Sequence, residues 1–436
     1  MRGGEIIMSE NIAFSPSRRK LLQALGAIGV MPLAMPKNCE ARSRGLLATR
    51  GVAQGIVKSK VCPGVVVGVG QATEEPQFVS EGSLSFDSKE RVDKNTLWRI
   101  YSMTKPITGM AAMLLIAEGK LTLDQPVSDF FSAFSSMQVL VDPKSGTETK
   151  PARNPITVRH LMTHTSGIGS AIPQTPSVGG PLADRYVKLG LRNGVFQANG
   201  QPDMDGAVTS LREFAERLAT VPLETEPGTR WRYSLGLDLL GAIIEVVSGR
   251  PFDIFLKEAF FDPLGMRSTW FRVPEHEKRR LVDNYATANG MSRSIDTGVN
   301  SLFLKRPTYP SGGGGLVSSA RDYDRFLMML VRGGTLDGAT VMPPSAIALG
   351  TSNLLPEGTD MSGYIYPSSG DGFGAGGRLV MSGPHKGAFG WLGAAGTLGM
   401  VNCGRQLRLV GMLNCMGDMS LPRLIPDAVN KDISTY

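Results

Sequence analysis

The chain is poor in the residues that build metal centres and disulfide frameworks. It contains 4 cysteines and 4 histidines among 436 residues. No two cysteines form a Cys-x-x-Cys pair, and no cysteines and histidines are spaced as in a zinc site. His160 and His164 lie four residues apart, but no glutamate between them could serve as a base. We therefore expect no metal ion, and we assign these histidines to the surface or the cap of a helix.

Charged residues are also few: they make up 19% of the chain, whereas hydrophobic residues make up 42%. The formal net charge of +7 includes +4 from residues 1–44, which leaves about +3 for the remainder. The sequence has no basic aromatic patch and no zinc-finger, homeodomain or RNA-recognition signature. The composition therefore does not favour nucleic-acid binding, and it predicts a large core in one composite domain or two intertwined ones.

No apolar segment is long enough to span a bilayer, which takes about 20 apolar residues. The uncharged run Leu21–Pro36 is shorter, and it follows the basic stretch Ser17-Arg18-Arg19-Lys20. A basic region before a short apolar run is typical of an export signal, and paired arginines are typical of the twin-arginine type. The match to that type is imperfect, because leucine rather than phenylalanine follows Lys20.

We expect residues 1–41 to form this twin-arginine-like signal and a linker, with cleavage after Ala41. The protein would then be periplasmic or secreted in a bacterium. The alternative is a cytoplasmic protein with an unstructured basic tail. Met8 is an alternative start to Met1.

The Gly-x-Ser-x-Gly nucleophile elbow of the α/β-hydrolases is absent as well. The chain instead has Ser102-Met103-Thr104-Lys105, in which the lysine amine can reach the serine hydroxyl on one helix face and take its proton. The pattern recurs at Ser17–Lys20, but only within the leader. Ser102 stands at the start of the apolar segment Met103–Glu118, which predicts a buried central helix that ends at Gly119.

Hydrophobic periodicity and turn residues predict an α+β fold. Strands are expected near both ends of the chain, at 64–70, 77–80, 376–381, 387–391, 396–402 and 407–413. Helices are expected between them, at 103–118, 156–162, 211–220 and 237–248. We predict one domain over residues 45–425, in which an antiparallel sheet with flanking helices (50–105 and 305–425) carries a mostly helical insertion (106–304). The Gly312–Gly315 run is expected to be a flexible hinge.

Two further stretches can complete a serine–lysine site. Tyr233 lies between a turn and a predicted helix, where its phenol can be held rigidly to shuttle a proton. The glycine-rich stretch Phe389–Thr397 can direct a free backbone N–H at an oxyanion, opposite the amide of Ser102. Taken singly, a core tyrosine and a sheet turn are the simpler interpretations. Together with Ser102 and Lys105, the two stretches favour an active site.

This combination resembles the penicillin-recognising serine hydrolases of the class C β-lactamase fold, and among them the family VIII carboxylesterases, over about residues 50 to 420. The resemblance implies that Ser102 is the acylated nucleophile, that Lys105 activates it and that Tyr233 shuttles the proton. It also implies an oxyanion hole formed by the amides of Ser102 and Ala394, and it implies no cofactor. The substrate pocket is then expected to include Trp391, Leu392, Gly393 and Leu235.

Two departures from the β-lactamase pattern concern the substrate. Leu235 stands where those enzymes carry the asparagine of Tyr-x-Asn, and Trp391-Leu392-Gly393 stands where they carry Lys-Thr-Gly. The site therefore lacks the amide and the cation that hold an anionic β-lactam. We expect a small uncharged ester or lactone as the substrate, with loops over 168–210 setting the acyl and alcohol size.

Three alternatives remain open at this point. The protein could be a β-lactamase or D,D-peptidase relative, or an acyltransferase that uses the same acyl-enzyme. It could also be a non-catalytic penicillin-binding-like module. The sequence indicates neither the natural substrate nor the oligomeric state.

Overall fold

The computed structural model describes residues 45–142, 148–170, 182–191, 208–288, 291–364 and 370–434. The predicted export signal with Ser17, and most of the 168–210 loops, lie outside these residues. No helix in the described ranges is both long and apolar enough to cross a membrane.

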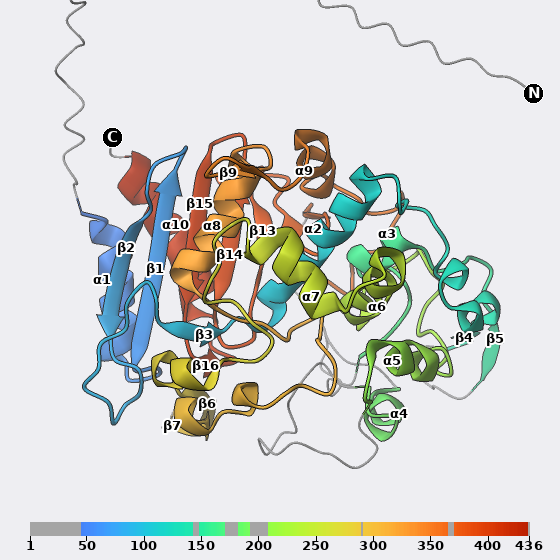
Figure 1. The fold of residues 1–436 in the computed structure, drawn as a ribbon, viewed down its shortest axis with the longest axis horizontal. Helices are drawn as coiled ribbons and strands as arrows, with labels where there is room; N and C mark the ends of the chain where they lie inside the picture. Colours follow the sequence, from blue (N-terminus) through green and yellow to red (C-terminus); the bar gives the residue numbers. More distant parts are fainter. Residues whose placement is uncertain are drawn as a thin grey trace, which may run out of the picture. The chain divides into compact units, whose positions relative to one another are not determined.

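A seven-stranded antiparallel sheet in the order β11-β12-β13-β14-β15-β1-β2 forms the centre of the domain. Strands from the two ends of the chain pair within it, because β1 lies beside β15 with Val66 opposite Met412 (Figure 1). The predicted fold, a sheet drawn from both chain ends, is confirmed. The strands are β1 (Gly64–Gln71), β2 (Gln77–Gly82), β11 (Gly372–Phe373), β12 (Arg378–Leu379), β13 (Phe389–Leu392), β14 (Leu398–Asn402) and β15 (Leu407–Met412).

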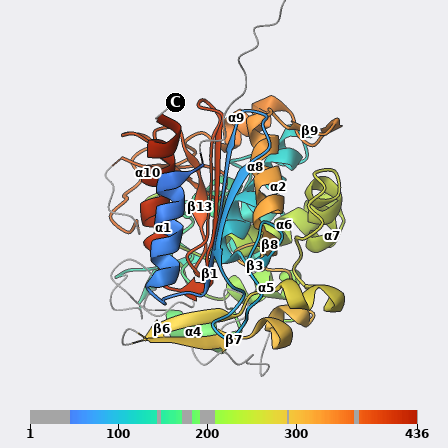
Figure 2. The same cartoon turned by 90° about the vertical axis from the view of Figure 1, so that its left-hand side faces the viewer.

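Helices cover both faces of this sheet, as Figure 2 shows. On one face α1 (Leu47–Lys58) and α10 (Ser420–Ser434) enclose an apolar cluster with β1 and β15. On the other face α8 (Ala320–Val331) packs on β14 and β15. Neither α1 nor α10 was predicted from the sequence.

The predicted central helix is α2 (Thr104–Ala117), and its side chains are buried on nearly all sides. It packs against α6 (Gly236–Ser248) and α9 (Pro344–Gly350). At Gly109 the helix backbone approaches the β11–β12 turn so closely that a Cβ would lie 2.1 Å from the carbonyl oxygen of Ala375. An all-round apolar sequence therefore gives a helix enclosed on all sides.

The region between the two halves of the sheet is mostly helical, with α3 (Val158–Met162), α4 (Ala183–Lys188), α5 (Leu211–Leu218), α6 and α7 (Phe252–Leu256). It also contains the hairpin β6 (Asn284–Ala288) and β7 (Met291–Asp296), which β16 (Cys415–Met416) joins. The remaining strands form two-stranded pairs: β3 (Leu97–Arg99) with β8 (Val317–Ser319), β4 (Gln138–Leu140) with β5 (Thr149–Pro151), and β9 (Thr335–Leu336) with β10 (Ala339–Thr340).

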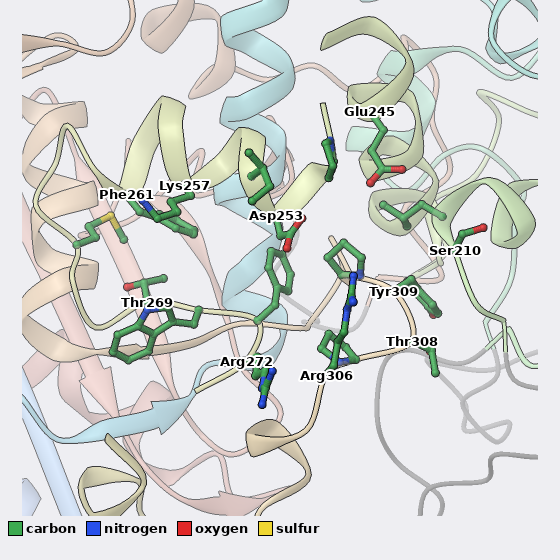
Figure 3. A pocket seen from close by; sticks show the side chains of 18 of the residues that line it. Ser210, Glu245, Asp253, Lys257, Phe261, Thr269, Arg272, Arg306, Thr308 and Tyr309 are labelled. Atoms are coloured by element: carbon green, nitrogen blue, oxygen red, sulfur yellow. The ribbon is translucent and has the colours of Figure 1, made fainter. Parts of the chain in front are cut away.

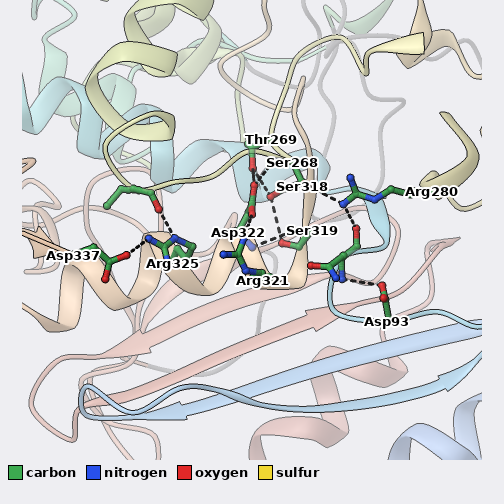
Figure 4. A network of polar contacts seen from close by, with 12 residues as sticks. Asp93, Ser268, Thr269, Arg280, Ser318, Ser319, Arg321, Asp322, Arg325 and Asp337 are labelled. Carbon is green, nitrogen blue, oxygen red and sulfur yellow. Dashed lines mark hydrogen bonds and ion pairs between the residues drawn. The ribbon is translucent and has the colours of Figure 1, made fainter. Parts of the chain in front are cut away.

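Polar contacts tie the start of α8 to the loop that follows Met266 (Figure 4). Ser319 caps the helix by accepting a hydrogen bond from the N–H of Asp322 over 3.1 Å. The Asp322 carboxylate in turn accepts hydrogen bonds from the Ser268 N–H (2.5 Å) and the Thr269 hydroxyl (3.1 Å). These bonds fix the β8–α8 junction, which follows directly on the Gly312–Gly315 run.

The expectation of a flexible hinge at Gly312–Gly315 is wrong. Gly312, Gly313 and Gly315 are buried, and a Cβ at Gly312 would lie 2.4 Å from the carbonyl oxygen of Leu237 in α6. Glycine is needed at positions 312 and 313, because the loop passes so close to α6 that a Cβ would meet Leu237 and Asp238.

Candidate active site

Ser102 lies in a short 3-10 turn, Tyr101–Met103, between β3 and the start of α2. The preceding Tyr101 has a positive φ of 44°, which is costly for a large side chain. Its phenol is buried and accepts a hydrogen bond from the Asn284 amide over 2.8 Å. The strained turn leaves Ser102 partly exposed while its neighbours Tyr101 and Met103 are buried.

The three residues predicted for the reaction lie together. The Ser102 hydroxyl shares a hydrogen bond of 2.6 Å with the Tyr233 hydroxyl, and Lys105 Nζ donates to Ser102 Oγ over 3.2 Å. Tyr233 is 131 residues away in sequence, so only the fold brings it to Ser102. The arrangement allows a proton of Ser102 to pass directly to either neighbour.

Lys105 is completely buried, at 0% exposure. Besides Ser102, its ammonium donates to the carbonyl oxygen of Gly313 over 2.5 Å and lies 4.6 Å from the centre of the Tyr233 ring. A cation over the face of an aromatic ring is attracted by the electron density of that face. Lys105 therefore has fixed partners on three sides.

His164 holds the segment that carries Tyr233. Its carbonyl oxygen accepts from the N–H of Arg232 (2.8 Å), and its Nδ1 accepts from the N–H of Ser234 (3.2 Å). Its ring lies 4.7 Å from the Tyr233 ring. Burial, and then the charge of Lys105, lower the pKa of His164 well below 6.5. Because Nδ1 can accept a hydrogen bond only when it carries no proton, these contacts require the neutral form of the ring.

The predicted pocket residue Trp391 forms an aromatic wall next to Tyr233. Its side chain is 2% exposed, and its ring stacks on that of Tyr233 with centroids 6.1 Å apart. Phe373 and Trp231 extend the wall, with Phe373 in edge contact with Trp391 at 5.2 Å. The side of Tyr233 that faces Trp391 is thus apolar and aromatic.

The end of β13 lies against the turn that carries Ser102. A Cβ on Gly393 would lie 2.5 Å from the carbonyl oxygen of Ile100, so this approach requires glycine. Within the described part of the chain the next amide, that of Ala394, donates no backbone hydrogen bond. This leaves the Ala394 amide available as a donor, and the oxyanion hole formed by the amides of Ser102 and Ala394 stays a prediction.

Two predicted pocket residues lie elsewhere. Leu235 is 0% exposed and belongs to the main apolar core. Leu392 packs against the cluster under α1 and α10, on the face of the sheet opposite Trp391, because neighbouring side chains of a strand point to opposite faces. Neither side chain lines the site, and the prediction is corrected for both.

Three buried residues were not assigned a role from the sequence: His164, Asp238 and Ser311. His164 was expected on a helix surface or cap: the surface position is wrong because the residue is fully buried, but it does directly follow Thr163, the C-cap residue of α3, at a positive φ of 58°. His160, in contrast, does form a capping box with Thr157. Asp238 could have been noticed in the sequence, because it lies in the first turn of the helix after Tyr233. Its contact with Ser311 could not, because that contact spans 73 residues and leaves no local sequence pattern.

A separate cavity of about 740 Å³ lies beside α7 (Figure 3). Its walls include Phe261, Arg272, Arg306 and Tyr309, but none of Ser102, Lys105 and Tyr233. Among the described residues, no group of three or more His, Cys, Asp or Glu side chains is placed to hold a metal ion.

Known proteins are similar to this chain in sequence and in fold. Uncharacterized protein MT1414 of Mycobacterium tuberculosis is 30% identical over 85% of this chain and 90% of its own length. Esterase EstB of Burkholderia gladioli is 32% identical over 57% of this chain and 60% of its own. The solved structure of "EstCE1, a hydrolase with promiscuous acyltransferase activity" has a TM-score of 0.70 and 25% identity, and the match covers 88% of this chain and 97% of that one.

The relatives thus include esterases and acyltransferases of the β-lactamase fold. The family model for Beta-lactamase matches residues 49–430. The resemblance drawn from the Ser102, Tyr233 and Trp391 motifs is confirmed, and the chain belongs to the Beta-lactamase family.

Proposed function

We propose that the protein is a serine carboxylic-ester hydrolase that acts on small uncharged esters or lactones through an acyl-enzyme. The observation that supports this most directly is the contact of Ser102 Oγ with Tyr233 Oη (2.6 Å) and Lys105 Nζ (3.2 Å). A serine hydroxyl becomes a nucleophile when a positioned group takes its proton. No cofactor enters the reaction.

The proposed reaction has two steps of the same kind. Tyr233 or Lys105 takes the proton of Ser102 while Oγ forms a bond to the ester carbonyl carbon. The amides of Ser102 and Ala394 hold the oxyanion, and the alcohol leaves with the proton. Water then attacks the acyl-enzyme by the same route in reverse, which releases the acid and restores the Ser102 hydroxyl.

The preference for an uncharged substrate rests on what surrounds Tyr233. Trp391 stacks on its ring, and Leu235 turns into the core, so neither supplies a polar anchor for a carboxylate. An apolar wall desolvates an anion without compensating it, whereas a neutral ester loses little there. The esterase EstB among the relatives agrees with this proposal.

The test is a hydrolysis profile over a library of p-nitrophenyl esters and lactones, with fluorophosphonate labelling of the same protein. We expect Ser102→Ala to lose labelling and at least about 10³-fold in kcat. Tyr233→Phe keeps the ring against Trp391 but loses the hydroxyl, so we expect a loss of about 10²- to 10⁴-fold in kcat with a folded protein.

The other outcomes separate the remaining functions. Nitrocefin hydrolysis as fast as that of p-nitrophenyl butyrate would contradict the ester preference and indicate a β-lactamase. A wild type that binds muropeptides but takes up no fluorophosphonate would indicate a non-catalytic module.

Acyl transfer is a second candidate, favoured by the likeness to EstCE1, a hydrolase with promiscuous acyltransferase activity. The same acyl-enzyme can pass its acyl group to an alcohol instead of water. Ester exchange with an added alcohol, measured against hydrolysis in the same reaction, distinguishes the two.

A further inference from the structure

Asp238 is a buried carboxyl group that the proposed reaction does not use. It lies in the first turn of α6 and is 1% exposed. Its Oδ1 accepts hydrogen bonds from Ser311 Oγ (2.5 Å) and from the N–H of Gly313 (3.1 Å), while Oδ2 has no hydrogen-bond partner among the described residues. Burying such a group costs free energy unless an opposite charge compensates it.

Asp238 and Lys105 bind the two backbone polar groups of one residue. Asp238 accepts from the Gly313 N–H, and the Gly313 carbonyl accepts from Lys105 Nζ over 2.5 Å. Residue 313 has to be glycine in this position, because a Cβ there would lie 2.5 Å from Asp238 Oδ2. The loop is further held by Thr108, whose hydroxyl donates to the Gly312 carbonyl over 2.8 Å. The position of Asp238 therefore fixes the acceptor that Lys105 faces.

The charges of the two side chains are also coupled. Burial raises the pKa of Asp238, and the hydrogen bond from Ser311, the charge of Lys105 and the Gly313 N–H oppose that rise. The other titratable groups that face this pair are His164, Tyr233 and Tyr309. His164 is neutral and the two tyrosines are not carboxyl groups. Among these described residues, Asp238 is therefore the group whose negative charge can balance a buried Lys105 ammonium.

We propose that Asp238 is the charge partner and positioning residue of Lys105: it keeps Lys105 an ammonium and holds the Gly313 carbonyl against it. This inference rests on the proposed function and decides which group takes the proton of Ser102. An ammonium has no lone pair, so the proton passes from Ser102 Oγ to a Tyr233 phenolate that Lys105 stabilises, as the bond from Oγ to the carbonyl carbon forms.

The test compares the rate of Ser102 labelling by a fluorophosphonate in Asp238→Asn, Asp238→Ala and Ser311→Ala across pH. Asparagine keeps the shape and the oxygen acceptor but removes the charge. We expect Asp238→Asn to slow labelling about tenfold or more at neutral pH, because Lys105 then loses its proton more easily and no longer stabilises the Tyr233 phenolate. The limb of the rate profile on which the rate falls at high pH should therefore move toward lower pH. Ser311→Ala removes the largest influence that opposes the rise in the pKa of Asp238, so we expect it to change the rate and the profile in the same direction as Asp238→Asn but by less.

Two results would overturn the proposal. If asparagine restores the rate lost in Asp238→Ala and the profile stays in place, Asp238 acts only as a hydrogen-bond acceptor. If Asp238→Asn labels faster than the wild type at neutral pH, Lys105 works as a neutral base.

Thermal unfolding gives a readout that needs no activity. Lys105→Met and Asp238→Asn each leave one buried group without its partner, so we expect the double variant to lose less stability than the two single losses combined. Strictly additive losses would contradict the pairing. A wild type that neither labels nor hydrolyses esters would contradict the proposed function, and this cycle would still test the pair.

Discussion

At the scale of single residues, His164 combines a strained backbone with contacts that no other residue of the site duplicates. Its φ of 58° lies in the left-handed region, where a side chain costs about 1 to 2 kcal/mol. Its carbonyl oxygen and Nδ1 bind the residues on either side of Tyr233. The strained backbone of His164 thus positions the two hydrogen bonds that orient the Tyr233 phenol toward Ser102.

A matched pair of substitutions tests this role. Asparagine adopts the left-handed region more readily than most residues, and its Oδ1 can accept the hydrogen bond from the Ser234 N–H. Alanine adopts this region less readily, and it has no side-chain acceptor for that N–H. We expect His164→Ala to lower kcat about tenfold or more with little change in KM, and His164→Asn to recover most of that loss. A His164→Ala enzyme with wild-type kcat and thermal midpoint would show that Tyr233 is positioned without this clamp.

The same residue shows where prediction from sequence ends. Ser102 and Lys105 could be paired because they lie three positions apart at the start of a predicted helix, and Tyr233 could be added because it precedes another predicted helix. The clamp of His164 on Ser234 spans 70 residues, and the bond between Ser311 and Asp238 spans 73. Such contacts depend on the packing of α2, α3 and α6, which periodicity does not determine.

At the scale of elements, segments with a strong local signal were predicted and segments that depend on distant partners were not. The helix α2 followed from its apolar residues alone. The helix α1 has no side-chain cap of its own; instead Asp432 of α10 accepts hydrogen bonds from the N–H groups of Ala48 and Thr49, both over 2.9 Å. Because the capping carboxylate lies 384 residues away in the sequence, no capping residue near the helix start indicates where α1 begins.

One buried ion pair joins three elements around the sheet. Arg408 of β15 and Asp324 of α8 are 0% and 1% exposed, with Arg408 Nε donating to Asp324 Oδ1 over 2.9 Å. Arg408 also donates to the carbonyl oxygens of Ala72 and Glu74, in the turn between β1 and β2. Burial raises the pKa of Asp324, and the charge of Arg408 opposes that rise.

We expect Asp324→Asn to lower the free energy of unfolding by about 3 to 5 kcal/mol, because it leaves the Arg408 guanidinium buried without a counter-charge. Urea unfolding followed by circular dichroism measures this loss. The exposed pair of Lys257 and Asp262 is the control: Asp262→Asn should change the free energy by less than about 1 kcal/mol. Equal effects of the two substitutions would contradict the argument.

At the scale of the whole molecule, the first and last described segments are stabilised together, because both contribute strands to the same sheet. The apolar cluster on one face draws on α1, β1, β15 and α10. The sequence predicted that both ends contribute to one sheet, since a buried apolar run lies near one end and strand and turn segments alternate near the other. It did not predict the hairpin β6–β7, although Asn289-Gly290 between its strands is a recognised hairpin signal.

The stability of the whole domain should also depend on pH through the half-buried His160. Burial lowers the pKa of His160 from 6.5 to about 4, with its Nδ1 accepting a hydrogen bond from the Thr157 N–H over 3.2 Å. The unfolded chain therefore binds a proton at higher pH than the folded one, and stability is lost as the pH falls from about 6.5 to about 4. This histidine alone accounts for about 2 to 3 kcal/mol over that window.

His160→Gln isolates this contribution from the carboxyl groups that titrate nearby. Glutamine at this position completes the capping box with Thr157, since it can accept the same N–H without titrating. We therefore expect equal stability of the variant and the wild type near neutral pH, and a shallower loss for the variant between pH 6.5 and pH 4. Unfolding curves in urea at several pH values measure both slopes. Parallel slopes would show that His160 keeps its ordinary protonation in the folded protein, and the acid loss would then belong to His164 and the carboxyl groups.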